Sequence, residues 1–377
     1  MKGRILCTVF SFLFCLGGLF CFANPGDEHR TLPIGSKAPD FSLKGVDGKI
    51  YTLASFSKYN ILVIVFTCNH CPTAQAYEDR IIQLAKDYEP KNVGLVAINP
   101  NDPSALRLDE LGYTDIGDTY DEMKIRAAEK KFKFPYLYDG GTQKTARAYG
   151  PVATPHVFIF DKERILRYQG RIDDVENPTK TPNHFDTRNA LDEMLLNKEV
   201  TVKTTKVFGC SIKWAEKGEW VRKGFEEWAK EPVSLDTIDE AAVKDLVRNN
   251  SGKLRVINVW ATWCGPCVVE FPEFVTMNHM YRGRDFEFIS ICLDDFEKKD
   301  KALKFLKEKQ ASNKNYIFNI DNKYAFIEAI NPKWQGALPY TMIVEPGGKI
   351  IYGEENIIDP AKIKKLIVDD PVIGRYY

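Results

Sequence analysis

Residues 254–280 read LRVINVWATWCGPCVVEFPEFVTMNHM, and this stretch decides the fold of the second half of the chain. Its first seven residues form a largely apolar, β-branched run, which is typical of a strand buried on both faces of a sheet. A helical pattern follows to about Met280. Cys264 and Cys267 therefore lie between the end of a predicted strand and the start of a predicted helix.

The first half of the chain repeats this order. Residues 61–86 read ILVIVFTCNHCPTAQAYEDRIIQLAK. The apolar run 61–66 predicts a buried strand, and a helical pattern begins at Thr73. Cys68 and Cys71 lie between the two. The sequence thus predicts two strand–C-x-x-C–helix units in one chain.

Further strands are predicted after each of these units. They occupy residues 93–98, 155–160, 286–292 and 340–344, with hairpin partners at 161–167 and 347–352. Alternating strands and helices are typical of a sheet covered by helices on both faces. We therefore predict an α/β protein with two α/β/α sandwich domains in tandem.

Composition and charge narrow the class of protein. The chain has 377 residues, of which 44% are hydrophobic and 28% charged, the balance of an ordinary folded protein. This length suggests two or three domains. Lys plus Arg and Asp plus Glu both number 52, so there is no net basic charge to bind nucleic acid.

The first 23 residues have the pattern of a secretory signal peptide. Lys2 and Arg4 give a basic start, an apolar run follows over residues 5–22, and Ala23 is a small residue at a cleavage point. The alternative is an uncleaved membrane anchor, because a helix of this length nearly crosses the bilayer core. Either interpretation places the rest of the chain outside the cytoplasm, in the periplasm or cell envelope.

The cysteines are grouped for redox chemistry or metal binding. Three of the nine lie in the leader, and four of the other six form the two C-x-x-C pairs. A chain of this size does not need closely paired cysteines as framework disulfides. The reactive form of a cysteine is the thiolate, which a helix N-terminus stabilises. Cys292 is expected to be an inert buried thiol, and Cys210 is either a third redox cysteine or a spare thiol.

Two prolines mark the same point in both halves. Pro155 and Pro339 each directly precede a predicted strand, in the dipeptides Thr154-Pro155 and Leu338-Pro339. A cis bond at these positions would expose backbone beside the cysteines, where an extended substrate chain could bind.

The stretch 259–272, VWATWCGPCVVEFP, resembles the active site of thioredoxin-like proteins of the TlpA/ResA type. The resemblance covers about residues 233–368. It implies a thioredoxin-like fold and an extracytoplasmic thiol–disulfide oxidoreductase. By this resemblance Cys264 is the nucleophile, Cys267 the resolving cysteine and Pro339 the cis proline.

The same resemblance implies that Glu270 assists proton transfer. The alternative interpretation is a plain surface glutamate in the first turns of the helix. The first half has no matching glutamate, because its equivalent position is Ala74. The candidate site residues are therefore Cys68, Cys71, Cys264, Cys267, Glu270, Pro155 and Pro339.

The first half is similar to the broader redoxin group of the AhpC/TSA type. The resemblance rests on APDFSL at 38–43, FTCNHCP at 66–72 and GCSIKW at 209–214, and it covers about residues 32–214. Peroxidases of this group use Thr-x-x-Cys, whereas here Thr67 directly precedes Cys68. This departure argues against peroxidase activity.

These observations predict the domain organisation. The segment from Glu216 to Pro232 mixes aromatic and charged residues and is predicted to be an amphipathic connector helix. The predicted parts are a signal peptide at 1–23, a redoxin domain at 32–214, a connector at 215–232 and a TlpA-like domain at 233–377.

We therefore expect an enzyme that needs no cofactor and exchanges electrons with cysteine pairs of exported proteins, apocytochromes among them. A membrane protein would be its electron donor. Two alternatives remain for the first domain. One is a thiol peroxidase. The other is a metallochaperone for copper, or a zinc site, in which His70, His156 and His184 join the first cysteine pair; the redox interpretation instead leaves His156 and His184 as surface or turn residues.

The residues between the cysteines differ between the two pairs: Asn69-His70 in the first and Gly265-Pro266 in the second. A His beside a thiolate stabilises the reduced form, which makes the disulfide a stronger oxidant. We expect the first pair to be more oxidising by on the order of 30 mV or more. Electrons would then run from the second pair to the first, if the connector lets the sites meet.

Overall fold

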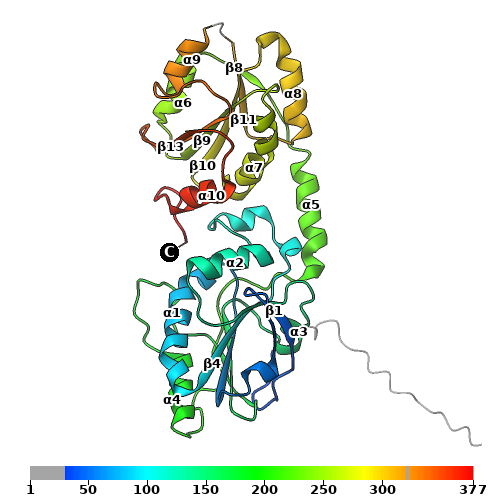
Figure 1. Ribbon diagram of the computed structural model, residues 1–377, viewed down its shortest axis with the longest axis vertical. Coiled ribbons are helices and arrows are strands. Elements are labelled where there is room, and N and C mark those ends of the chain that lie inside the picture. Colours follow the sequence, from blue (N-terminus) through cyan, green and yellow to red (C-terminus); the bar gives the residue numbers. More distant parts are fainter. Residues whose placement is uncertain (1–29, 320–321, 377) are drawn as a thin grey trace, which may run out of the picture.

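The computed structural model describes residues 30–319 and 322–376, so the predicted signal peptide at 1–23 lies outside the described residues. The described chain forms two sheets with helices packed around each, joined by helix α5 (Figure 1). The predicted α/β class with two tandem sandwich domains is confirmed. No helix in this part of the chain is both long and apolar enough to span a membrane.

The first sheet has the strand order β2-β1-β5-β4-β3-β6-β7. Its strands are β1 (Ser42–Gly45), β2 (Ile50–Thr52), β3 (Ile61–Phe66), β4 (Val93–Asn99), β5 (Tyr136–Tyr138), β6 (His156–Phe160) and β7 (Leu166–Gly170). Strand β3 is central, parallel to β4 and antiparallel to β6. The predicted hairpin after β6 is present, but β7 begins later than predicted because Asp161 and Arg164 form the turn.

The second sheet has the order β13-β12-β9-β10-β11-β8. Its strands are β8 (Asp236–Ile238), β9 (Leu254–Trp260), β10 (Phe286–Cys292), β11 (Lys314–Phe318), β12 (Tyr340–Val344) and β13 (Ile350–Glu355). Strand β9 is parallel to β10 and antiparallel to β12, as β3 is to its own neighbours. Gly347 and Gly348 adopt positive φ in the turn before β13, so this strand also begins later than predicted.

Two helices follow the central strands and carry the cysteine pairs. Cys71 is the N-cap of α1 and Cys264 is the N-cap of α7. Helix α5 lies within the segment predicted as the connector. The α-helices are α1 (Pro72–Tyr88), α2 (Tyr120–Glu129), α3 (Lys144–Tyr149), α4 (Asp186–Leu195), α5 (Gly218–Trp228), α6 (Glu240–Arg248), α7 (Gly265–Tyr281), α8 (Lys299–Glu308), α9 (Lys323–Ile330) and α10 (Pro360–Asp369).

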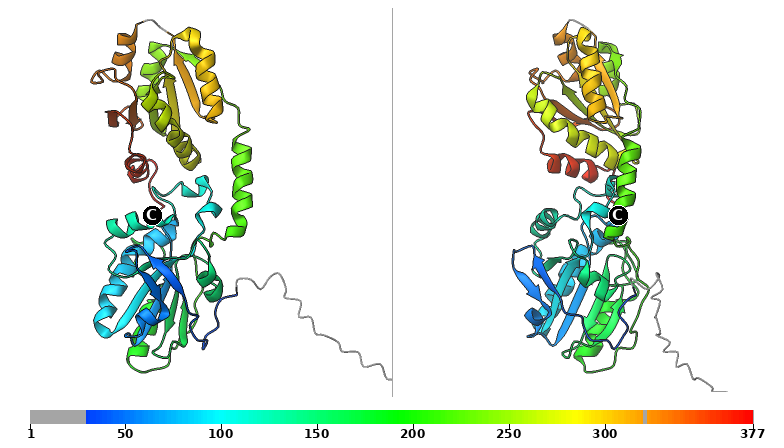
Figure 2. Two further views of the ribbon diagram at one scale, coloured as in Figure 1. Left: turned by 45° about the vertical axis from the view of Figure 1, so that its right-hand side comes forward. Right: turned by 90° about the vertical axis from the view of Figure 1, so that its right-hand side faces the viewer.

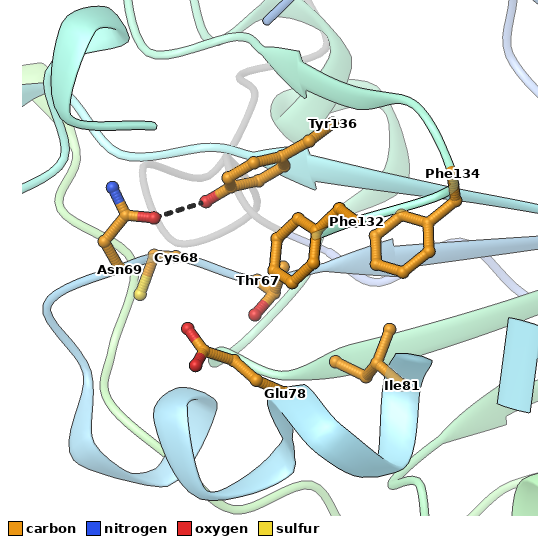
Figure 3. Close-up of a pocket in the computed structure, with 8 residues that line it drawn as sticks. All are labelled: Thr67, Cys68, Asn69, Glu78, Ile81, Phe132, Phe134 and Tyr136. Carbon is orange, nitrogen blue, oxygen red and sulfur yellow. Dashed lines mark hydrogen bonds between the residues drawn. The ribbon is translucent and has the colours of Figure 1, made fainter. Parts of the chain in front are cut away.

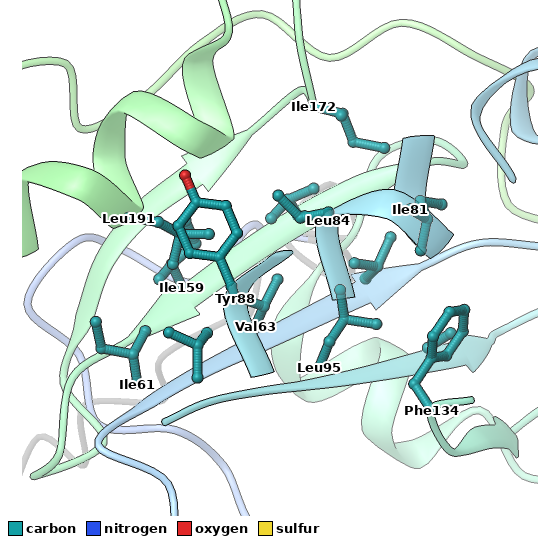
Figure 4. Close-up of a cluster of buried hydrophobic side chains, with 14 of the residues drawn as sticks. Ile61, Val63, Ile81, Leu84, Tyr88, Leu95, Phe134, Ile159, Ile172 and Leu191 are labelled. Carbon is teal, nitrogen blue, oxygen red and sulfur yellow. The ribbon is translucent and has the colours of Figure 1, made fainter. Parts of the chain in front are cut away.

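The core explains why β3 is apolar at every position. Ile61 and Val63 pack on one face of the sheet with Leu84 of α1 and Leu191 of α4 (Figure 4). Ile64 points the other way and belongs to a separate cluster on the opposite face. A strand covered on both sides has no solvent-facing position, which is what the continuous apolar run predicts.

The two domains touch through the end of α7, the segment before α2 and the C-terminal tail (Figure 2). The hydroxyl of Tyr281 donates a hydrogen bond to the Thr114 carbonyl at 2.9 Å. Arg375 donates one to the buried Asp115 carboxylate at 2.9 Å. Segments far apart in sequence therefore hold the second domain against one edge of the first.

Helix α7 runs away from this contact. Its last residue, Tyr281, touches the first domain, whereas Cys264 caps its other end. The helix has 17 residues. At about 1.5 Å per residue its two ends lie roughly 25 Å apart. The second cysteine pair is thus at the end of α7 remote from the first domain.

Candidate active sites

The second domain carries a disulfide between Cys264 and Cys267. Cys264 Sγ accepts a hydrogen bond from the backbone N–H of Cys267 at 3.3 Å. The free N–H groups and the dipole at a helix N-terminus stabilise negative charge on sulfur. This position therefore favours the thiolate that a reduced Cys264 needs for attack on another disulfide.

The surroundings of this disulfide are partly open. Trp263, next to Cys264, is 61% exposed. The Leu338–Pro339 bond is cis, as the sequence suggested. Leu338 packs against the cluster that contains both cysteines, and Ala337 before it is exposed. Backbone beside the disulfide is thus accessible from solvent.

Glu270 is buried, so its interpretation as a surface glutamate is wrong. Only 2% of the residue is exposed, because it lies on the face of α7 that packs against the sheet. Its carboxylate accepts hydrogen bonds from Asn258 Nδ2 at 3.0 Å and from the backbone N–H of Ile358 at 2.9 Å. Burial outweighs these bonds and raises the pKa of Glu270 to about 7. The site therefore holds a carboxyl that changes protonation near neutral pH.

The first domain holds Cys68 and Cys71 as free thiols that are 2% and 0% exposed. Cys71 Sγ accepts hydrogen bonds from a backbone N–H in the first turn of α1 at 3.4 Å and from the backbone N–H of Cys210 at 3.3 Å. Cys68 Sγ lies 3.1 Å from Thr154 Oγ1. The Thr154–Pro155 bond is cis. The fold thus brings both cysteines and Pro155 into one site.

The pKa values of the two thiols in this site shift in opposite directions, and Cys71 is the more acidic of the two. Burial raises the pKa of this thiol, but hydrogen bonds from Cys210 and Cys68 and the positive charge of His70 outweigh burial and hold the pKa well below its ordinary value. Burial and the neighbouring Cys71 raise the pKa of Cys68. Of the two cysteines, the second is therefore the one whose thiolate is favoured.

A buried ion pair supplies the positive charge. His70 Nδ1 lies 2.5 Å from Asp118 Oδ2, and Asn101 donates to the same oxygen at 2.8 Å. The backbone N–H of Asn69 donates to the other oxygen at 2.8 Å. Burial alone would lower the pKa of His70, but the Asp118 carboxylate outweighs it and raises that pKa. Asp118 thus favours the charged form of His70, and that charge lowers the pKa of Cys71.

Asp118 is not among the residues predicted from the sequence. It directly precedes Thr119, the N-cap of α2, whose capping box with Glu122 marks the helix start. No sequence pattern links this position to His70, which lies in a different turn. Only the path of the segment between β4 and α2 brings the two together.

A narrow pocket lies behind Cys68 (Figure 3). It is lined by Thr67, Cys68, Asn69, Glu78, Ile81, Phe132, Phe134 and Tyr136. The volume of the pocket that the centre of a water molecule can occupy is about 10 Å³, which is enough for one water. Burial raises the pKa of Glu78, although Arg126 and Lys130 each lie 3.4 Å from its carboxylate. The first site therefore also has a buried carboxyl, one that the comparison of Ala74 with Glu270 did not reveal.

Cys68, His70 and Asp118 form a group whose ligand atoms lie within 4.8 Å of one another, close enough for a metal ion. Asp118, however, already accepts four N–H hydrogen bonds, two on each oxygen. A carboxylate in this state has no lone pair left for a metal without losing a partner. The contacts of Asp118 are therefore those of a residue that orients His70, and not those of a metal ligand.

The other residues considered for a metal lie elsewhere. His156 is not a surface or turn residue, because it is 1% exposed in β6 and its Nε2 lies 2.8 Å from Gln169 Oε1. Burial lowers its pKa to about 4, so it is neutral. His184 is exposed. Cys292 is buried, and burial raises its pKa to about 12, as expected for an inert thiol.

Comparisons with known proteins agree with this geometry. Residues 34–169 match the AhpC/TSA family model and residues 234–367 match the Redoxin family model. A thioredoxin of Coprinus comatus is 42% identical over 45 residues, which are 12% of this chain and 42% of that protein. The thiol–disulfide oxidoreductase ResA of a Bacillus cereus strain is 24% identical over 127 residues, which are 32% of this chain and 66% of ResA. The chain thus spans less than two thirds of both relatives.

A solved structure of an uncharacterized conserved protein from Geobacillus kaustophilus is 39% identical, with a TM-score of 0.43. That likeness covers 48% of this chain and 92% of the other. The family matches fall on the two halves in succession, and each match spans the C-x-x-C pair and the central strand of its half. The chain therefore carries two redoxin-type domains in tandem, one that matches the AhpC/TSA family model and one that matches the Redoxin family model.

Proposed function

We propose that the protein is a thiol–disulfide oxidoreductase whose second domain exchanges electrons with cysteine pairs of other proteins. One observation carries this proposal: the Cys264–Cys267 disulfide lies at the N-terminus of α7 beside exposed Trp263 and the backbone before cis Pro339. A client needs a surface to lie on beside the reacting sulfur, and exposed Trp263 and Ala337 offer one next to Cys264, which is 5% exposed. The name of the ResA relatives, thiol–disulfide oxidoreductase, supports the same chemistry.

Reduction of a client disulfide takes two exchange steps. The Cys264 thiolate attacks one client sulfur, a mixed disulfide forms, and the other client sulfur leaves as a thiolate. Cys267 then attacks the sulfur of Cys264, which releases the client and forms the Cys264–Cys267 disulfide. Two electrons pass from this pair to the client, and the reverse sequence oxidises a client dithiol.

Glu270 serves the second step as a proton acceptor. It lies three residues after Cys267, on the same side of α7. A carboxyl with a pKa of about 7 can take up the Cys267 proton and release it again near neutral pH. Its hydrogen bonds from Asn258 and Ile358 hold it in place.

The clients in this proposal are exported proteins with cysteine pairs, apocytochromes among them, and the electron donor is a membrane protein. The leader pattern at residues 1–23 supports export to the periplasm or cell envelope, either with cleavage or with the leader kept as an anchor.

The proposal is tested by trapping. In the Cys267→Ser variant the attacking thiolate has no resolving partner, so mixed disulfides with a reducible protein substrate should accumulate and disappear on adding dithiothreitol. Cys292→Ser is the matched control, because that thiol is buried in β10. Absence of any mixed disulfide with Cys267→Ser would overturn the proposed role of Cys264.

A second candidate, thiol peroxidase activity of the first domain, is favoured by the AhpC/TSA match and by the water-sized pocket at Cys68. The raised pKa of Cys68 and the position of Thr67 count against it. Consumption of hydrogen peroxide by wild type but not by Cys68→Ser would support this activity. Metal analysis of the reduced protein tests the metallochaperone alternative.

A further inference from the structure

The Gly209–Cys210 segment crosses the first site beside Thr154, the residue before cis Pro155. The backbone N–H of Thr154 donates a hydrogen bond to the Cys210 carbonyl at 3.0 Å, in an isolated antiparallel bridge. A Cβ on Gly209 would lie 2.1 Å from the Thr154 carbonyl oxygen, and Gly209 has a φ of 138°. Glycine is therefore required for this close approach.

This pairing covers backbone that is uncovered in the second domain. There, in the part of the chain that the structure describes, no β-bridge joins Leu338 to another segment. An extended client chain could pair with the backbone before Pro339, whereas at Thr154 that place is taken by the chain itself. The Gly209–Cys210 segment thus lies in the first site as a bound substrate chain would.

The same segment places a third thiol at the pair. The backbone N–H of Cys210 donates to Cys71 Sγ at 3.3 Å, and the Cys210 thiol also interacts with Cys71. Cys68 and Cys71 are buried, but Cys210 is only half-buried. Of these three residues, Cys210 is the most exposed to solvent.

We propose that Cys210 is the thiol through which the first site exchanges with its clients, and that it passes the disulfide inward to Cys71 and then to Cys68. This inference rests on the proposed thiol–disulfide exchange function and names the residue that carries it in the first domain. The client class is a small or protein disulfide that can reach a partly exposed sulfur.

The proposed reaction is a series of three thiol–disulfide exchanges, each of which forms one S–S bond and breaks another. Cys210 gives its proton to the Cys71 thiolate and attacks one client sulfur; a Cys210–client bond forms, and the other client sulfur leaves with that proton. Cys71 then attacks the Cys210 sulfur and releases the second client sulfur, which takes the proton of Cys68. Finally Cys68 attacks Cys71 and releases Cys210 as a thiolate. The client gains two electrons and two protons, and the site ends as a Cys68–Cys71 disulfide.

The test uses the full chain with Cys264→Ser and Cys267→Ser, reduced and then exposed to oxidised glutathione. With the further change Cys71→Ser, peptide mapping should find glutathione on Cys210. With Cys68→Ser instead, it should find a Cys71–Cys210 disulfide. Glutathione on Cys68 in the Cys71→Ser protein would overturn the inference.

The rate at which the Cys68–Cys71 disulfide forms gives a second test of the proposal. Adding Cys210→Ser to the same background should slow formation of the Cys68–Cys71 disulfide by about tenfold or more, because the most exposed thiol of the site is removed while the segment that covers the pair stays. Adding Cys292→Ser should leave the rate unchanged. Equal rates of disulfide formation with and without Cys210 would refute the role of Cys210, while thiol–disulfide exchange by the first domain would stand. Failure of the background protein to form any disulfide would instead refute the exchange function of this domain.

Discussion

Both cysteine pairs are buried, but their surroundings differ: in the second domain Trp263 beside the pair is exposed and, among the described residues, no β-bridge forms at Leu338, whereas in the first domain the equivalent Thr154 is paired with Cys210. Both domains share a central strand, a following helix capped by a cysteine of the pair, and a cis proline, although the cap is the second cysteine in the first domain and the first cysteine in the second. The shared elements therefore supply the chemistry of a reactive thiol. Access to that thiol is set by a segment outside them.

The two sites also differ in how they hold charge. The second has a buried carboxyl, Glu270, without a cationic partner, so its proton is retained to about pH 7. The first has an ion pair of His70 and Asp118 that keeps a positive charge near Cys71. One site is built to move a proton and the other to stabilise a thiolate.

The largest expected effect separates the open site from the covered one. Cys264→Ser should lower the rate at which the reduced protein reduces a model protein disulfide by on the order of 100-fold, because the attacking thiolate is removed. Cys68→Ser should change this rate little, since the backbone beside Cys68 is already paired with Cys210 and leaves no room for a protein client. Insulin reduction followed by turbidity measures both. If Cys68→Ser is the more damaging change, the comparison of access is wrong.

Glu270 gives the next effect, on stability. Its pKa is raised from 4.5 to about 7, so the folded state holds the proton more tightly and the wild type loses stability as pH rises through that window. Glu270→Gln lacks this loss. Its stability advantage over wild type should therefore grow by up to about 3 kcal/mol between pH 4 and pH 8.

Urea unfolding of the oxidised proteins at several pH values measures this difference. The mutant and wild type share every other titrating group, so those contributions cancel. Parallel stability curves would show that Glu270 does not titrate in this window, and its role as a proton acceptor would lose its support.

The reduction potentials should differ by a smaller free energy. The Cys68–Cys71 pair should be the more oxidising by about 30 mV or more, which for two electrons is about 1.4 kcal/mol. Asp118→Asn should narrow this gap, because His70 loses the carboxylate that favours its charged form and the Cys71 thiolate loses stabilisation.

Glutathione titration of each pair, with the other pair changed to Ser, gives both potentials. Asp102→Asn is a matched control, because Asp102 caps a short 3-10 helix and has no contact with His70 among its hydrogen bonds. Equal potentials in wild type, or a gap that widens with Asp118→Asn, would contradict the role of His70.

The smallest effect concerns the contact that the two domains share. Among the described residues, Arg375→Ala leaves the buried Asp115 with one cationic partner, the more distant Arg126 at 3.6 Å, and should cost about 1 kcal/mol of stability. The exposed pair of Arg222 and Glu226 is the control, for which about 0.5 kcal/mol or less is expected. Shifts in the urea midpoint measure both; equal shifts would mean that Arg375 adds nothing to the contact.

Much of the fold follows from the sequence because buried strands leave a simple pattern. The runs 61–66 and 254–260 are strands with the predicted bounds, and Pro155 and Pro339 precede the strands expected of them. Both cysteine pairs cap helices as predicted. These features are local, so a short stretch of sequence is enough to specify them.

The features that were missed depend on irregular segments. Asp118 reaches His70 and Cys210 covers Thr154 through stretches that have no period and no apolar alternation. The pairing that covers the backbone beside Cys68 follows from these contacts and not from the C-x-x-C motif. A motif thus predicts which atoms can react, but not whether a client can reach them.

Helix α7 has one more consequence, for the order of the reaction. Exchange needs two sulfurs in contact, and α7 holds Cys264 at the end remote from the domain contact made by Tyr281. In this arrangement electrons cannot pass from one pair to the other within a molecule. Transfer between them requires a carrier that diffuses from site to site, so its rate rises with carrier concentration, whereas an internal transfer would proceed at the same rate at any dilution.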